Sequence, residues 1–421
     1  MSRRTWALLG AAVSTLWSGA VLADDYDWSG FRLGATVGVG MGAVAWDEID
    51  AGLSENLGTF GSLAVNGGVF AGYDLEVAPG MVFGLEAGLQ FFNAEGSSTQ
   101  LTVLDQYEFR SLGAAYAGVR AGGEVAAGSL LYGRLSYAAI HAQSSVDTPA
   151  AQEGFVHGYQ AAIGLETEVM DNVTVRVEGT YTKALTSFET NYDGSVYLDT
   201  YTPDHLGVNV GVTYRFGNEG RGPRLANAAP QRSWSGGYVG VLAGGMSSST
   251  VNGFRETAIP GAEGPVSYIG YELGAYVGVT QQLGEQFVVG LEGDVSYHTA
   301  VWDFVDDESR DIGSSDHKAQ VSARLGFLVN PATLIYARAG WGLMHINPDE
   351  LLAEPGTEAA YVQTLSAGLG IEVMTSPNSL LRAEGIYTTA IEEYRFNDTV
   401  LNPLYIKPSS LSARVGMAFL F

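Results

Sequence analysis

Segments of this chain recur in the same order at a nearly constant offset, and this internal repeat constrains the fold more than any local motif. "WSGF" at 28–31 returns as "WSGG" at 234–237, and "VFGLEAGL" from Val82 returns as "VVGLEGDV" from Val288. "LLYGRLSYAAIH" from Leu130 likewise returns as "LIYARAGWGLMH" from Leu334. The chain is therefore a tandem duplication, and each half is expected to contain the same set of structural elements.

Within each half the side chains alternate with a period of two. From Val173 to Lys183 the sequence "VTVRVEGTYTK" places Val173, Val175 and Val177 on one face and Arg176 and Glu178 on the other. Strict alternation of apolar and polar residues predicts a β-strand with one apolar face, not a helix.

We predict eight strands in each half, joined by links that alternate between short and long. The predicted strands span 29–45, 64–77, 81–94, 107–124, 129–142, 154–169, 173–187 and 205–217, then 235–248, 266–281, 286–300, 316–329, 333–346, 360–374, 379–393 and 407–421. "APG" at 78–80 and "NPA" at 330–332 are short links, whereas 95–106 and 301–315 are long and polar. Short turns at one end and long loops at the other are typical of outer-membrane barrels.

Composition excludes several classes of protein. The 421 residues carry a formal net charge of −25, which would repel nucleic acid because such binding neutralises phosphates with Lys and Arg. The chain has no Cys, so a disulfide framework and a thiolate metal site are excluded. After residue 23 no apolar run is long enough to cross a bilayer as a helix, so any crossing must be by strands.

The first residues are expected to be an export signal. Arg3 and Arg4 precede an apolar stretch from Trp6 to Trp17, and small residues up to Ala23 suggest cleavage there. "SRRTW" also resembles a twin-arginine signal, which would deliver a folded protein. The general secretory route fits better, because strands bound for a membrane must stay unfolded until they arrive.

The polar faces of the strands carry charges that match between the two halves. These charges are predicted to point into the barrel interior, because they are too costly against lipid. They are Glu86, Arg120, Arg134, Glu168, Arg176 and Glu178 in the first half, and Glu292, Arg324, Arg338, Glu372, Arg382 and Glu384 in the second. Each set balances three carboxylates with three guanidinium groups, which predicts a paired network that fills a narrow interior.

The opening "WSGF", the Gly-rich strand "LGATVGVGMG" from Leu33 and the terminal Phe resemble the eight-stranded outer-membrane barrels of alphaproteobacteria, porin-like surface antigens related to opacity-type and OmpA-type domains. In that family the last strand carries an assembly signal read by the barrel-assembly machinery. The resemblance implies this role for Asn209, Gly211, Tyr214 and Phe216 in the first half, and for Arg414, Gly416, Phe419 and Phe421 in the second.

Two architectures satisfy the strand count. The sequence favours two tandem eight-stranded barrels over one sixteen-stranded barrel, because residues 218–232 form a polar linker and the charges balance within each half. The expected organisation is a signal peptide at 1–23, a first barrel at 24–217, the periplasmic linker at 218–232 and a second barrel at 233–421.

No catalytic or cofactor motif is present, which predicts a protein that is not an enzyme and has no cofactor. Two weaker ideas concern ligands at the outer ends of the strands. His141 with His345, and His298 with His317, could serve as axial haem ligands, although polar rim residues explain them more simply. The acidic segment from Trp302 to Asp311 could bind divalent cations, but a solvated charge run is more common.

Aromatic residues near strand ends are expected to form the girdles that flank the membrane. These residues are Trp28, Trp46, Tyr73, Phe91, Tyr181, Trp234, Trp302 and Trp341. The leading hypothesis is an integral outer-membrane protein that supports envelope integrity and displays acidic loops, with lipid, lipopolysaccharide and the assembly machinery as partners. The alternative is a sixteen-stranded porin that passes small solutes, and a weaker third option is a lipid-modifying membrane enzyme. An extracellular ligand for the loops is left open.

Overall fold

The computed structural model describes residues 27–50, 53–99, 106–146, 152–191, 198–216, 232–254, 264–303, 311–348, 359–395 and 404–421. In the first half these residues form β1 (Gly30–Asp50), β2 (Leu53–Ala78), β3 (Met81–Thr99), β4 (Gln106–Ala126), β5 (Ser129–Val146), β6 (Gln152–Met170), β7 (Val173–Ala184), β8 (Phe188–Thr190) and β9 (Leu198–Arg215). In the second half they form β10 (Gly236–Phe254), β11 (Gly264–Leu283), β12 (Phe287–Asp303), β13 (Asp311–Asn330), β14 (Thr333–Pro348), β15 (Ala360–Ser376), β16 (Ser379–Ala390), β17 (Tyr394–Arg395) and β18 (Leu404–Leu420). Within these ranges no helix has the length and apolar character needed to span a membrane.

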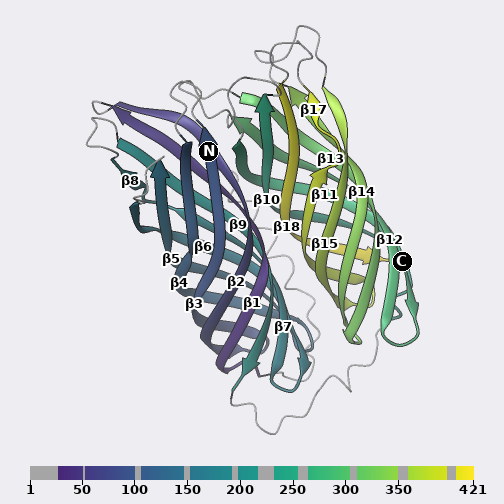
Figure 1. The fold of residues 1–421 in the computed structure, drawn as a ribbon. Helices are drawn as coiled ribbons and strands as arrows, with labels where there is room; N and C mark the ends of the chain where they lie inside the picture. The colour runs from purple at the N-terminus through teal and green to yellow at the C-terminus, as the bar shows by residue number, and fades with distance from the viewer. Residues whose placement is uncertain are drawn as a thin grey trace.

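Each half closes into its own antiparallel barrel (Figure 1). In the first half the ring closes between β1 and β9, with Arg32 opposite Arg215 at one end and Ile49 opposite Leu198 at the other. The second ring closes between β10 and β18, from Tyr238–Leu420 to Phe254–Leu404. A single pairing, Val266 with Phe60, joins β11 to β2. The separate closure shows two eight-stranded barrels, as the sequence favoured, and not a ring of sixteen strands.

The strands extend further toward the long loops than the hydrophobic pattern predicted. β2 begins at Leu53 where the pattern predicted residue 64, and β9 begins at Leu198 where it predicted residue 205. Backbone pairing continues there through polar residues such as Thr200 and Asp199, which lie opposite Asp47 and Glu48. The alternation of apolar residues therefore marks only the apolar band of the barrel. The strands continue beyond this band toward the long loops.

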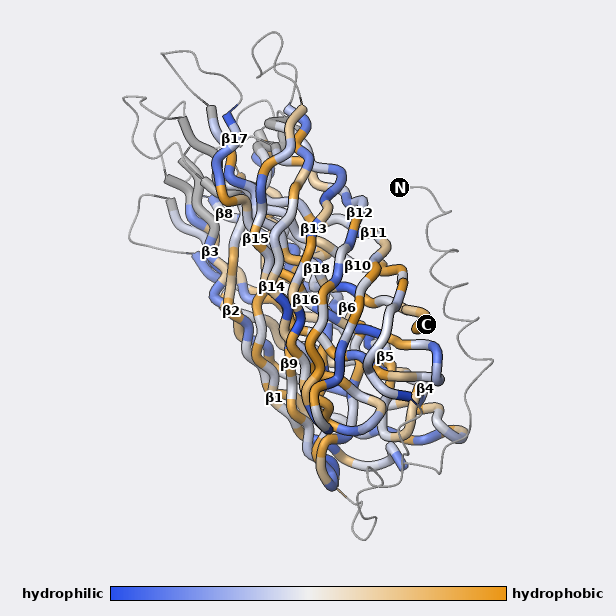
Figure 2. Tube along the Cα trace, turned by 90° about the vertical axis from the view of Figure 1, so that its right-hand side faces the viewer, coloured by the Kyte–Doolittle hydropathy of each residue, from blue (hydrophilic) through white to orange (hydrophobic). Residues whose placement is uncertain are grey.

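The outward faces of the strands are apolar and the inward faces are polar. On β1, Phe31, Leu33 and Val37 are exposed, whereas Arg32 is fully buried. Hydrophobic residues recur along the strands of both barrels (Figure 2). This arrangement is the inverse of a soluble barrel and matches a protein surrounded by lipid.

The two barrels pack side by side along strands that are equivalent in the repeat (Figure 1). A Cβ atom added at Gly179 on β7 would lie 2.8 Å from the Ala413 Cβ atom on β18, and one added at Gly385 on β16 would overlap the Val208 side chain on β9. These two contacts exchange equivalent positions, as expected for a pseudo-two-fold interface. Val208 is 8% exposed because it packs against the second barrel, although alternation alone would place it against lipid.

The interface is larger than these glycine contacts. Leu165 and Val177 of the first barrel form one buried apolar cluster with Ile371, Val373 and Ala383 of the second. At the end that carries the short turns, the hydroxyl oxygens of Ser129 and Thr167 both lie 3.3 Å from the Thr333 Oγ1 atom. The barrels therefore bury apolar and polar surface against each other as a fixed pair.

The predicted aromatic girdle is only partly correct. Tyr73, Phe91 and Trp341 are exposed on the outer surface, and Tyr181 is partly buried. The side chains of Trp28, Trp46, Trp234 and Trp302 are instead buried, with exposures of at most 3%. These four tryptophans cannot contact lipid headgroups, and the girdle assignment is wrong for them.

Candidate functional site: the two charged barrel interiors

Glu86 on β3 is the centre of the ion-pair network in the first barrel. Its carboxylate oxygens lie 2.6 Å from Arg32 Nη1, 3.0 Å from Arg134 Nε and 3.2 Å from Arg176 Nη1. The three guanidinium groups come from β1, β5 and β7, so the contacts cross the interior from several sides. All four side chains are at most 1% exposed.

A second group of charges lies nearer the short turns. The Arg215 Nη2 atom lies 3.2 Å from Asp74 Oδ2 and 3.1 Å from Glu166 Oε1. Arg32 Nε lies 3.0 Å from the same Asp74 oxygen, and Arg120 forms a short ion pair with Glu166. The Thr174 hydroxyl also donates to Glu166 Oε1 at 2.6 Å. This group joins β1, β2, β4, β6 and β9 across the interior.

In the second barrel Glu292 on β12 takes the position of Glu86. Its oxygens lie 2.6 Å from Arg382 Nη2, 2.8 Å from Arg338 Nη1 and 3.1 Å from Arg324 Nη1. Arg324 and Arg382 each contact Glu372 as well, at 2.8 and 2.6 Å. Two of the three arginines recur in the repeat, since Arg134 and Arg176 correspond to Arg338 and Arg382. The position of Arg32 is taken by Tyr238, whose hydroxyl donates to Glu292 at 2.7 Å.

The second barrel carries a further charged layer toward the long loops. Arg414 Nη1 lies 3.1 Å from Glu272 Oε1, and its Nη2 atom lies 2.7 Å from Glu384 Oε1 and 3.1 Å from Asp294 Oδ1. Lys318 Nζ lies 3.3 Å from the same Glu272 oxygen. A buried charge is tolerated only when it is paired and hydrogen-bonded, and each member of this layer satisfies that condition.

Aromatic rings fill the space between the charges in both barrels. The Arg120 guanidinium lies 3.9 Å from the Tyr132 ring centroid, and Arg324 lies 3.9 Å from the Tyr336 centroid. The Tyr132 hydroxyl donates to Glu178 and the Tyr336 hydroxyl donates to Glu384, both at 2.7 Å. Cations stacked on rings gain attraction from the ring quadrupole, so the tyrosines serve as filler and as additional partners.

The repeated tryptophans of the "WSG" segments cover the interiors of the barrels at the end with the short turns. Trp28 packs with Val82, Leu130 and Tyr132, and the Arg215 guanidinium lies 4.6 Å from its ring centroid. Trp234 packs with Tyr238 and Leu334 in the second barrel, and its Nε1 atom donates to the Pro331 carbonyl at 3.1 Å. Each interior is therefore covered by an indole at the end with the short turns.

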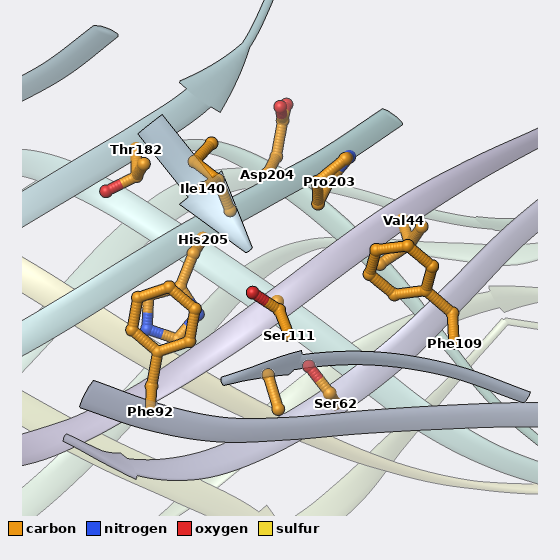
Figure 3. A pocket seen from close by; sticks show the side chains of 12 residues that line it. Val44, Ser62, Phe92, Phe109, Ser111, Ile140, Thr182, Pro203, Asp204 and His205 are labelled. Carbon is orange, nitrogen blue, oxygen red and sulfur yellow. The ribbon is translucent and has the colours of Figure 1, made fainter. Parts of the chain in front are cut away.

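A small cavity lies in the first barrel on the long-loop side of this network. Figure 3 shows side chains that line it. The cavity is lined by Ser62, Phe92, Phe109 and His205 among others. His205 stacks on Phe92 at 4.4 Å between ring centroids, and its Nε2 atom lies 3.2 Å from Asn66 Oδ1. Glu86 lies on the same strand as Phe92, and Arg32 on the same strand as Gly42, both nearer the short turns. The cavity therefore lies on the long-loop side of the ion pairs.

The structure brings most of the predicted interior charges into ion pairs within each barrel. Glu168 is buried, but the ion pairs with Arg120 and Arg215 reach Glu166 in the place predicted for Glu168. The reason is strand register: Glu166 lies opposite Arg176 on β7, as Glu372 lies opposite Arg382 on β16. Matching "GLETEVM" with "GLGIEVM" letter by letter displaced the first-half carboxylate by two residues.

Other interior charges were missed because they do not recur in the other copy. They are Arg32, Asp74 and Arg215 in the first barrel, and Glu272, Asp294 and Lys318 in the second. The sequence signal available for them was their position on the inward face of an alternating strand. They were left out of the prediction because it kept only charges that recur at the equivalent position of the other half.

The proposed assembly residues lie on the strands that close the two rings, except Phe216 and Phe421, which directly follow β9 and β18. Asn209 and Arg414 are buried in the interiors, whereas Tyr214, Phe216, Phe419 and Phe421 are exposed on the outer surface. Gly211 and Gly416 lie opposite Thr36 and Leu242 in the closing ladders. The exposed aromatic pair is therefore accessible to another protein in both copies.

The histidines considered for haem do not come together in the pairs that the sequence suggested, although His317 and His345 stack on each other at 4.4 Å between ring centroids. His141 belongs to the first barrel and His345 to the second, and His298 is buried with its Nε2 atom 2.8 Å from the Ser315 hydroxyl. The acidic cation-binding idea rests on residues 304–310, which lie outside the described residues.

Comparison with known proteins agrees with this architecture. The family model for the outer membrane protein beta-barrel domain matches residues 9–216 and again 225–419. The 25 kDa outer-membrane immunogenic protein of Brucella abortus biovar 1 is 28% identical over 166 residues, which cover 39% of this chain and 70% of that protein. The same-named protein of Brucella canis is 27% identical over 200 residues, covering 47% and 84%.

Solved structures with a similar fold include two kinds of outer-membrane protein. The deltaS2 mutant of the TodX monoaromatic hydrocarbon channel has 11% identity and a TM-score of 0.30, covering 95% of this chain and 91% of its own. Neisserial surface protein A has 14% identity and a TM-score of 0.27, covering 45% of this chain and 98% of its own. With the family model matched twice over the two rings, this chain belongs to the outer membrane protein β-barrel domain family and resides in the cell outer membrane.

Proposed function

We propose that this protein is a pair of closed, non-enzymatic barrels with a structural and surface role in the outer membrane. The observation that carries the proposal is the ion-pair network, in which Glu86 and Glu292 each hold three guanidinium groups inside their barrels. An eight-stranded barrel has an interior just wide enough for its own side chains, and here those side chains hold one another in place. The protein therefore contributes to envelope integrity and displays its long loops outside the cell.

The porin alternative gains no support from the geometry. A water-filled channel needs about sixteen strands around one interior, whereas these strands close as two rings of eight. A solute would also have to separate buried ion pairs, and breaking such a pair costs several kcal/mol. Diffusion of small solutes through either interior is not part of the proposed function.

The proposed partners follow from the outer surfaces. Exposed apolar residues such as Val37 and Leu291 offer a surface for lipid, and lipopolysaccharide is the partner proposed for the opposite end from the short turns. The exposed pairs Tyr214–Phe216 and Phe419–Phe421 serve the barrel-assembly machinery as the signal of a final strand. The Brucella relatives are named immunogenic proteins, which supports display of the loops at the cell surface.

Deletion of the coding sequence is expected to make the host more sensitive to detergent and to large apolar antibiotics, because a stabilising outer-membrane component is lost. Survival in detergent measures the effect, and the wild-type chain supplied in trans is expected to restore it. A control chain with Glu285→Ala, which changes an exposed turn residue, should restore survival as fully as the wild-type chain. An unchanged deletion strain, or one that only takes up small hydrophilic solutes more slowly, would contradict the structural role.

A further inference from the structure

The outer wall of the second barrel carries a cluster of metal-ligand atoms near the long loops. Asp316 Oδ1 lies 2.6 Å from His317 Nδ1 and 2.8 Å from His345 Nδ1. The three ligand atoms all lie within 4.8 Å of one another. The side chains of Asp316 and His317 are 41% and 43% exposed and that of His345 is 16% exposed, so an ion in solution can reach them.

A β-bulge explains why neighbouring residues point at the same spot. Between the pairs Ser314–Asn347 and Lys318–Met344, β13 has one residue more than β14. Successive residues of a regular strand point to opposite faces, but a bulge redirects a side chain, and bulges often occur beside functional sites. Here the bulge lets both Asp316 and His317 approach His345.

The ligand types favour a first-row divalent transition metal. Imidazole nitrogen and carboxylate oxygen bind Zn²⁺ at about 2.0–2.2 Å, which separates neighbouring ligands in a tetrahedron by about 3.3 Å. To reach this value, the observed separations of 2.6 and 2.8 Å need to open by about 0.7 and 0.5 Å. Three protein ligands leave the fourth position to water, as in many zinc sites with an open position.

A neighbouring tyrosine supports the orientation of one imidazole. The His317 Nε2 atom lies 2.9 Å from the Tyr361 hydroxyl on β15. When Nδ1 binds a metal, the ring proton must lie on Nε2, where it can be donated to the tyrosine oxygen. Such a partner fixes the tautomer and the ring direction of a metal-bound histidine.

We propose that Asp316, His317 and His345 bind one divalent transition-metal ion, with Zn²⁺ as the physiological class, and that Tyr361 positions His317. The site lies outside the closed interior and is independent of the structural role proposed above.

The first barrel provides a natural control for this proposal. The same bulge occurs between Arg110–Gln143 and Ala114–Ile140, and His141 occupies the position of His345. The residues equivalent to Asp316 and His317 are Leu112 and Gly113, so the two other ligands are missing. The first barrel therefore has the same bulge and one equivalent histidine, but it lacks the other two ligands.

Zn²⁺ titration by calorimetry of the tag-free full-length chain in detergent tests the proposal. We expect one site per chain, weakened more than 100-fold in His345→Ala and Asp316→Asn, and about 10- to 100-fold in Tyr361→Phe. His141→Ala is expected to bind like the wild type. Co²⁺ in place of Zn²⁺ should give the intense visible absorption of a tetrahedral site, and this absorption should disappear in His317→Ala.

Each variant is first checked for barrel formation by its heat-modifiable mobility in gels, and only folded protein is titrated. The proposal is overturned if Zn²⁺ binds the His345→Ala protein as tightly as the wild type. It is also overturned if His141→Ala weakens binding as much as His345→Ala does, because the ion would then not distinguish the two barrels.

Discussion

Replacing Glu292 by alanine is expected to lower the free energy of unfolding of the second barrel by about 3–5 kcal/mol, which is the usual cost of removing one partner from a buried ion pair. The Glu292 carboxylate contacts Arg324, Arg338 and Arg382, all within 3.1 Å. Without it, the barrel interior keeps three guanidinium groups and loses the negative charge between them. Urea titration of the protein in lipid vesicles, followed by heat-modifiable mobility, measures this loss.

Two matched variants separate charge from other effects. Glu285→Ala removes an exposed carboxylate from the turn before β12 and is expected to change stability by less than about 0.5 kcal/mol. Glu292→Gln keeps the shape and the hydrogen-bond acceptor but removes the charge, so we expect an intermediate loss. If Glu292→Ala unfolds at the same urea concentration as the Glu285→Ala control, the ion-pair network does not brace the barrel.

Replacing Gly385 by leucine is expected to separate the two barrels without unfolding either. A side chain at this position would overlap Val208 of the first barrel, whose own position is fixed within β9. Overpacking of this kind costs about 1–3 kcal/mol, equivalent to an association about 5- to 150-fold weaker. The readout uses a protease site inserted within 218–232: after cleavage in mild detergent, wild-type halves should stay together and Gly385→Leu halves should part.

Gly293 offers the control for this substitution. It also lies on an outward face, and the nearest atom to an added Cβ is the Gln320 carbonyl oxygen at 3.9 Å, so Gly293→Leu has room for its side chain. Its cleaved halves are expected to stay together like those of the wild type. Cleaved Gly385→Leu halves that remain associated would show that the β16–β9 contact does not hold the pair.

The fold was predictable because its physical signals are local. Alternation in segments such as 173–183 and the regular exchange of short and long links predicted strands, and the repeat predicted their number in each half. Antiparallel closure of β1 on β9 and of β10 on β18 then follows from an even number of long strands within each half. Strand ends such as Leu53 were not predictable, since polar residues continue the ladder without an apolar pattern.

The interior and the interface were predictable to different degrees. Charges that recur in both halves, such as Glu86 and Glu292, were found by matching the copies, whereas Glu166 depends on strand register that letters alone do not reveal. The barrel–barrel contact gave no signal in sequence. Val208 has to be apolar whether it meets lipid or another barrel, so only packing distinguishes the two surroundings.

The central claim is that each barrel is closed by its own side chains, and planar-bilayer recording of the purified full-length protein tests it most directly. Interior ion pairs fill each barrel, and a tryptophan covers the end with the short turns. We therefore expect the same current as through a bilayer without protein, with no large or steady channels at any concentration at which the protein inserts. Large, steady, reproducible conductance steps from folded protein would contradict the account.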